Sequence, residues 1–134
     1  MREAIFFGNT IGFLGADVSP NENNQLPVLL WWMVESVPEA DYSISLQLIA
    51  SDASLVSQID KQIDPPEAEI GEIPTSQMQP NGNYIDWRVL ELPSDLANGE
   101  YTLQVVVYQW WDGVRLTLDD GSDILVLQIV RIDR

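Results

Sequence analysis

Residues Leu92–Tyr108, with the sequence LPSDLANGEYTLQVVVY, decide the fold of this chain. A turn-rich segment passes through Gly99, a residue that adopts backbone angles other residues resist. From Tyr101 onward, apolar side chains recur at every second position, on residues 101, 103, 105 and 107. Such a period of two is typical of a β-strand that buries one face.

The approach to this strand follows the spacing L-x-x-G-x-Y-x-L, from Leu96 to Leu103. The spacing is that of the tyrosine corner in immunoglobulin-like sandwiches, where a tyrosine at a strand start bonds its hydroxyl back to the preceding turn. The alternative is a plain turn and strand in which Tyr101 is simply a core residue.

Short segments of similar character recur along the chain and predict about eight strands with no convincing helix. The expected strands are one or two edge strands within residues 4–18, followed by residues 27–35, 42–50, 55–60, 84–92, 100–109, 114–118 and 123–132. Residues 27–35 are a continuous apolar run, which suits a strand covered on both faces, with Trp31 and Trp32 pointing in opposite directions. We therefore predict one all-β domain over residues 1–134, an antiparallel immunoglobulin-like sandwich, with a closed barrel as the alternative.

Residues 61–84 form a long Pro-rich loop in this prediction, because their four prolines and two glycines exclude a long helix or a central strand. Long loops in compact domains are often functional. The alternative, which we favour, is an ordered crossover between the two sheets.

Composition excludes several classes of function. The chain has 21 acidic and 6 basic residues, a formal net charge of −15, so nucleic acid and anionic lipid would be repelled. The acids are spread along the chain, which favours a role in solubility. There is no cysteine and no histidine, so thiolate chemistry, sulfur metal sites and the commonest general base are missing. No apolar run reaches the ~18 residues of a membrane span, so we expect no direct membrane insertion. We also expect no cofactor.

A set of short motifs occurs in a particular order along the chain. It comprises Trp32, Asp41-Tyr42, Leu46-Gln47-Leu48, Gln58-Ile59-Asp60, Pro74-Thr75-Ser76, Asp86, Leu92–Leu96, Gly99–Leu103, Tyr108 and Gly113–Leu116. By their order and spacing, residues 26–132 resemble the C-terminal β-sandwich domain that follows the membrane-embedded region of certain bacterial, Chloroflexi-like glycosyltransferases. Those proteins are similar to the dolichyl-phosphate-mannose protein mannosyltransferases. Two departures are that Met78 replaces a tryptophan of the family pattern, and that the turn at Pro80-Asn81-Gly82 is one residue longer.

This resemblance implies a non-catalytic accessory domain outside the cytoplasm, tethered to the membrane through a parent chain. Its partner would be the membrane domain of that parent protein or a glycan. The resemblance supplies no catalytic residues. The sequence agrees, because it has no histidine base and no Gly-x-Ser-x-Gly elbow.

The sharpest candidate site is Trp110-Trp111 at the tip of a predicted hairpin, with Tyr108 before the pair and Arg115 after it. One interpretation is a platform on which the apolar face of a sugar stacks while acids bind its hydroxyls. A second is a surface that docks against a protein partner. A third is a lid, in which one or both tryptophans fold back over the open end of the sandwich.

A minor candidate is the acidic turn that contains Asp119, Asp120 and Asp123. Its carboxylates are the hard oxygen ligands that calcium prefers. The segment lacks the spacing and the closing glutamate of an EF-hand loop. An ordinary acidic β-turn is therefore the favoured interpretation.

Overall fold

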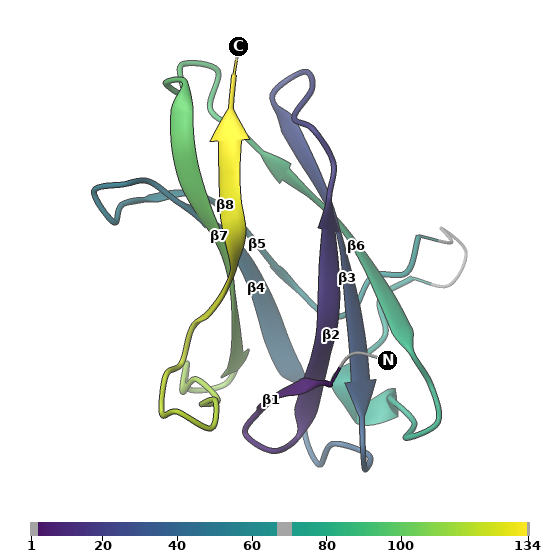
Figure 1. Cartoon of the computed structure of the whole chain (residues 1–134). Coiled ribbons are helices and arrows are strands. Elements are labelled where there is room, and N and C mark those ends of the chain that lie inside the picture. The colour runs from purple at the N-terminus through teal and green to yellow at the C-terminus, as the bar shows by residue number, and fades with distance from the viewer. Residues whose placement is uncertain (1–2, 67–70, 134) are drawn as a thin grey trace.

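The fold is two facing antiparallel sheets, seen in a computed structural model that describes residues 3–66 and 71–133 (Figure 1). Sheet A contains, in spatial order, β1 (Ile5–Phe7), β2 (Ile11–Val18), β3 (Gln25–Val34) and β6 (Tyr84–Glu91). Sheet B contains β5 (Leu55–Lys61), β4 (Tyr42–Ile49), β7 (Gly99–Gln109) and β8 (Leu125–Ile132). The predicted antiparallel sandwich is confirmed. In the part of the chain that is described, no helix is both long and apolar enough to cross a bilayer.

Of the two interpretations of the turn before β7, the structure has the tyrosine corner. The Tyr101 hydroxyl donates a hydrogen bond of 2.7 Å to the carbonyl oxygen of Ala97. Gly99 has a φ of 151°, a backbone conformation that residues with a Cβ rarely adopt. The glycine therefore allows the chain to turn, and the tyrosine hydroxyl fixes the turn to the strand.

The core lies between the sheets and is built from alternate residues of each strand. Trp32 is its largest member, fully buried, with the rings of Phe7 and Phe13 at centroid distances of 6.1 and 5.2 Å. Trp31 points to the opposite side of β3, as expected. The prediction that β3 is covered on both faces is wrong, because Trp31 and Met33 on the outer side are only partly buried. In Figure 1, none of the labelled strands is stacked over this outer face of sheet A among the described residues.

The segment between β5 and β6 is an ordered crossover from sheet B to sheet A, as favoured above; its residues 67–70 lie outside the described part. It contains a β-bridge between Ile63 and Ile73 and a short 3-10 helix, η1 (Thr75–Gln77). Ile63 and Met78 are fully buried in the core. The Thr75 hydroxyl ties the crossover to the start of β4, because it accepts a hydrogen bond from the backbone N–H of Tyr42.

The strand predicted over residues 114–118 is wrong. Only a single bridge, Tyr108 to Arg115, continues the β7 hairpin, and β8 begins at Leu125 rather than at Asp123. The reason is that the segment leaves β7 after Leu116, whose N–H still donates to the carbonyl oxygen of Val107, and then contacts a turn of sheet A. The carbonyl oxygen of Thr117 accepts a hydrogen bond of 2.8 Å from the N–H of Gly8, in the turn that joins β1 to β2. Residues 114–124 therefore close one end of the sandwich.

Candidate functional site

An aromatic cluster lies at the end of β7; we call Tyr42, Trp110 and Trp111 the aromatic tip. Trp110 is 65% exposed and Trp111 is 48% exposed. The Trp111 ring lies 6.2 Å from that of Tyr42, and the two indoles meet edge to face at 6.0 Å and 89°. Trp111 therefore leans on the end of the sandwich as a partial lid, while Trp110 leaves most of its surface in water.

Tyr108 and Arg115 flank the aromatic tip in different ways. The Tyr108 hydroxyl donates a hydrogen bond of 2.8 Å to a carboxylate oxygen of Asp60. Arg115 forms an exposed ion pair with Asp123, at 3.6 Å. The four predicted residues are thus neighbours along one hairpin, but their polar groups bind other partners and do not converge on one point.

A chain of hydrogen bonds runs across the outer face of sheet B and ends at the same carboxylate. Gln104 donates to Gln47 at 2.8 Å, Gln47 donates to Ser45 at 3.1 Å, and Ser45 donates to Asp60 at 2.7 Å. These residues come from three neighbouring strands, so their contact could not be read from local sequence. The chain fixes Asp60 from one side while Tyr108 holds it from the other, which makes a rigid polar strip.

The acidic turn has the geometry of a turn. One carboxylate oxygen of Asp120 accepts a hydrogen bond of 2.8 Å from the backbone N–H of Ser122, and Asp123 pairs with Arg115. Within residues 3–66 and 71–133, no three acidic side chains come together in a way that could hold a metal ion. The calcium site over Asp119, Asp120 and Asp123 thus has no geometric support.

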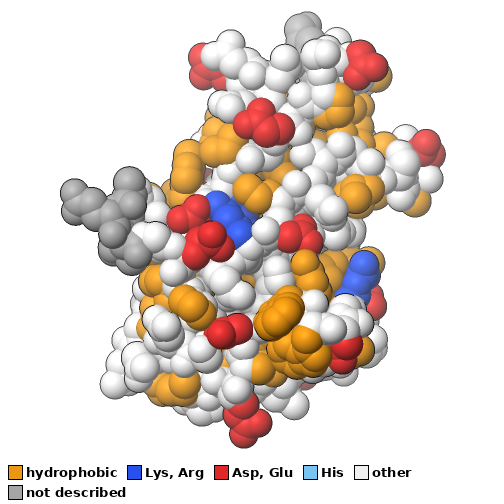
Figure 2. Space-filling model, turned by 180° about the vertical axis from the view of Figure 1, so that it is seen from behind, with side chains coloured by type: hydrophobic (Ala, Val, Ile, Leu, Met, Phe, Trp, Pro, Cys, Tyr) orange, Lys and Arg blue, Asp and Glu red, His pale blue; other side chains and the backbone are white. Residues whose placement is uncertain are grey.

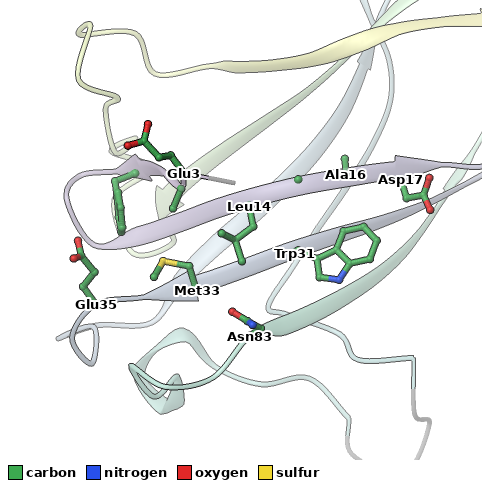
Figure 3. Close-up of a pocket in the computed structure, with 11 residues that line it drawn as sticks. Glu3, Leu14, Ala16, Asp17, Trp31, Met33, Glu35 and Asn83 are labelled. Carbon is green, nitrogen blue, oxygen red and sulfur yellow. The ribbon is translucent and has the colours of Figure 1, made fainter. Parts of the chain in front are cut away.

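A groove of about 970 Å³ lies on the outer face of sheet A (Figure 3). Figure 3 shows Met33, Leu14 and Trp31 in a row along β2 and β3, with Glu3 and Glu35 at one end and Asp17 at the other. We call these six residues, with the others that line the hollow, the outer groove. It combines an apolar floor with an acidic rim.

Two glycines of β2 lie opposite the large residues of β3. Gly15 pairs with Trp31 and lines the groove, so β2 offers no side chain there. Gly12 pairs with Met33, and the Met33 sulfur packs over it, because a Cβ placed on Gly12 would lie 2.6 Å from that sulfur. The sequence contained this signal, an I-G-F-L-G segment beside the W-W-M run, but their pairing is visible only in the structure.

Asp86 and Arg88 on β6 form a fully buried ion pair, with 3.0 Å between Arg88 Nε and a carboxylate oxygen of Asp86. The same oxygen accepts a bond of 3.1 Å from the Trp32 indole. Burial raises the pKa of Asp86, against the opposing effect of the Arg88 charge and the hydrogen bonds. No buried side-chain polar atom in the described residues lacks a partner. The pair is therefore a satisfied internal brace rather than a reactive site.

Comparison with known proteins does not assign this chain to a family. The chain matches no protein-family model, and no curated protein is significantly similar to it. The functional argument therefore rests on the surfaces of the molecule. Figure 2 shows one of these surfaces from behind, with acidic side chains dispersed among apolar ones and few basic groups.

Proposed function

We propose that this chain is a non-catalytic domain that acts by contact, with the aromatic tip as its principal contact surface. The observation that carries the proposal is the exposure of Trp110 and Trp111, at 65% and 48%. Indole surface left in water is unfavourable by roughly 25 cal/mol for each Å². Tryptophan is also among the residues most enriched where binding energy concentrates. A partner that covers the tip recovers this free energy.

The parent that best fits the chain is a membrane glycosyltransferase-like protein, for which this would be an extracytoplasmic accessory domain. Support comes from the ordered motifs of residues 26–132 and from the absence of cysteine and histidine. The tip would then dock against the membrane domain of the parent protein or hold its acceptor.

A second candidate function is carbohydrate binding at the same tip. It is favoured by the carboxylate of Asp60, which Tyr108 and Ser45 hold by hydrogen bonds on the outer face of sheet B. Tyr108 stands two residues before Trp110, at the end of β7. An apolar sugar face packs on an indole, and fixed acceptors beside it bind the sugar hydroxyls. Rigid acceptors improve such binding because little order is lost when the ligand arrives.

Alanine variants of the tip test these functions against the lid interpretation. We expect Trp110→Ala to shift the melting temperature by no more than about 2–3 °C, because this side chain is 65% exposed. Trp87→Ala is a matched control, since Trp87 is 37% exposed on the outer face of sheet A. If Trp110→Ala and Trp111→Ala both lower the melting temperature well beyond the effect of Trp87→Ala, the two tryptophans are a structural lid.

Binding assays then separate the two partners. If the tip binds carbohydrate, calorimetric titration with oligosaccharides should give a micromolar dissociation constant, and Trp110→Ala should abolish the binding. The accessory role is supported if the domain binds no glycan on an array but co-purifies with the membrane region of the parent chain. Turnover of glycosides by the purified domain, lost on replacement of a single acid, would overturn both.

A further inference from the structure

The edge of sheet A beside β1 is only partly covered. β1 pairs with Ile11–Phe13 of β2, and the pairing of β2 with β3 has a register shift between Phe13 and Gly15. Beyond this point, residues 15–18 of β2 pair with β3 on one side only; among the strands of the described chain, none lies on the other. A strand edge of this kind presents backbone groups that can pair with another chain.

Two hollows lie on either side of this free edge. The outer groove lies on the solvent face of sheet A. A second hollow of about 520 Å³ lies between β2 and β8, lined on its inner side by Phe13, Leu125 and Leu127. Both hollows are lined by Glu3, Leu14, Gly15 and Ala16, so they meet at the same stretch of β2.

This arrangement matches the period of an extended chain. A strand paired to the free edge of β2 would direct alternate side chains to opposite faces, one set over the outer groove and the other toward the hollow beside β8. The edge from residue 15 to residue 18 spans roughly 13 Å, the length of a short strand. Backbone hydrogen bonds would supply affinity, and the two hollows would select side chains.

We propose that an extended segment of a protein partner adds to the edge of β2, with apolar residues facing the inner hollow and Lys or Arg facing the outer groove. The inner hollow takes apolar side chains because its walls include Phe13 and Leu127, which face the core. A long basic side chain suits the outer groove because its hydrocarbon stem can lie on Trp31 while its cation reaches an acid.

Charge complementarity identifies this occupant. The described lining of the outer groove contains three acids, Glu3, Asp17 and Glu35, and no lysine or arginine. The four basic residues that the structure describes, Lys61, Arg88, Arg115 and Arg131, lie elsewhere, each in an ion pair with an aspartate. Among the described residues, no cation balances these acids, so a basic partner would meet an unneutralised rim.

A second copy of the chain fits poorly at this edge. Two β2 edges brought together would place Asp17 and Glu3 of one copy near those of the other, and each copy carries a net charge of −15. Like charges at an interface are unfavourable by several kcal/mol. The acids and the irregularity at Leu14 are the devices by which natural edges avoid self-association, and they leave the edge open to a basic segment.

The probe is an acetylated, amidated seven-residue peptide in which valine and lysine alternate, with a valine–glutamate peptide as its control. We expect the lysine peptide to bind the full chain with a dissociation constant of roughly 100 µM or tighter, and the glutamate peptide not to bind. Hydrogen exchange should show new protection at those amides of Gly15–Val18 that point away from β3, because the alternate amides already bond to β3. Trp111→Ala should leave this binding unchanged, so the test is independent of the aromatic tip.

Charge reversal tests the site against diffuse attraction. The variant Asp17→Lys/Glu35→Lys should weaken binding of the lysine peptide by about tenfold or more. Asp95→Lys/Asp119→Lys changes the net charge equally at exposed residues that line neither hollow, and should weaken it far less. Equal weakening by both variants would overturn the proposal, since binding would then follow overall charge.

Backbone methylation tests strand addition itself. Two versions of the lysine peptide, N-methylated at odd or at even residues, each lose the hydrogen bonds of one edge. Because only one edge of the peptide faces β2, one version should bind and the other should not. Equal binding by both versions would refute strand addition. If no peptide binds, and an oligosaccharide protects the same amides from hydrogen exchange, the groove is assigned to a glycan and the proposal is overturned.

Discussion

Replacement of Arg88 by methionine gives the sharpest test of how this sandwich is held together. Arg88 is fully buried, and all its N–H groups are used. Its Nε donates to Asp86 at 3.0 Å. Its Nη1 donates to the carbonyls of Ile44 and Ile59 at 2.7 and 3.0 Å, and its Nη2 to those of Lys61 and Gln62 at 3.0 and 3.3 Å. The guanidinium thus joins β6 of sheet A to β4, to β5 and to the residue that follows β5.

The expected magnitude follows from these contacts. Arg88→Met leaves the carboxylate of Asp86 buried without its ion-pair partner, and removes the donors to four carbonyls. Breaking a buried ion pair by removing one partner destabilises by about 3–5 kcal/mol. A domain of this size has a free energy of unfolding of roughly 5–15 kcal/mol. The melting temperature should therefore fall by about 10–20 °C.

The measurement is urea denaturation followed by tryptophan fluorescence, with the slope checked for two-state behaviour. Arg131→Met is the matched control, because Arg131 and Asp133 form an ion pair whose side chains are 63% and 68% exposed; the change should stay within about 0.5 kcal/mol. In the double variant Asp86→Leu/Arg88→Met, neither charge is left alone, so its effect should be smaller than the sum of the single effects by about 1–3 kcal/mol. Strict additivity, or a loss below about 1 kcal/mol in Arg88→Met, would refute the reasoning.

Three further predictions concern single groups. Tyr101→Phe removes the bond to Ala97 and should lower the free energy of unfolding by about 0.5–1.5 kcal/mol in urea titrations; an unchanged value would show that the corner does not stabilise the turn. Gly12→Ala places a Cβ 2.6 Å from the Met33 sulfur, 3.0 Å from the Phe6 ring and 3.1 Å from the Met33 carbonyl oxygen, and should destabilise by about 1–3 kcal/mol, with partial relief in Gly12→Ala/Met33→Ala. Because burial raises the pKa of Asp86, this carboxyl contributes stability that is full below its unfolded pKa and is lost as the pH rises through its folded pKa. Asp86→Asn should lack this part of the pH dependence in denaturation series over acid pH, and an identical slope would contradict it.

Local patterns were enough to predict the features that depend on neighbours in sequence. The tyrosine corner needs only Leu96, Gly99 and Tyr101 in the right spacing, and the period of two places alternate residues of β7 in the core. The hairpin of β4 and β5 likewise follows from two short strands around a polar turn. These predictions succeeded because the interactions that decide them lie within about ten residues.

The orientation of β6 could not be predicted in this way. Asp86 and Arg88 alternate with Ile85 and Trp87, so a strand that buried its bulky apolar residues would expose the charged pair. The structure has the reverse, with Ile85 and Trp87 at 38% and 37% exposure and the charged pair fully buried. The reason is tertiary: the Trp32 indole and the strand carbonyls that satisfy the pair come from other elements.

The same brace explains why the two sides of the sandwich differ. On the side of β5 and β6, Arg88 bridges the sheets, Ser57 donates to the carbonyl of Glu91 at 2.6 Å, and Trp87 N–H donates to the carbonyl of Asp64 at 2.7 Å. On the side of β2 and β8, the described residues form no strand pairing, and a hollow lies between the edges. An added strand on that open side would displace no backbone pairing and would leave the brace intact. The buried Asp86–Arg88 pair therefore holds the two sheets together on the side of β5 and β6. The side of β2 and β8 stays open, and there we propose that a basic segment binds.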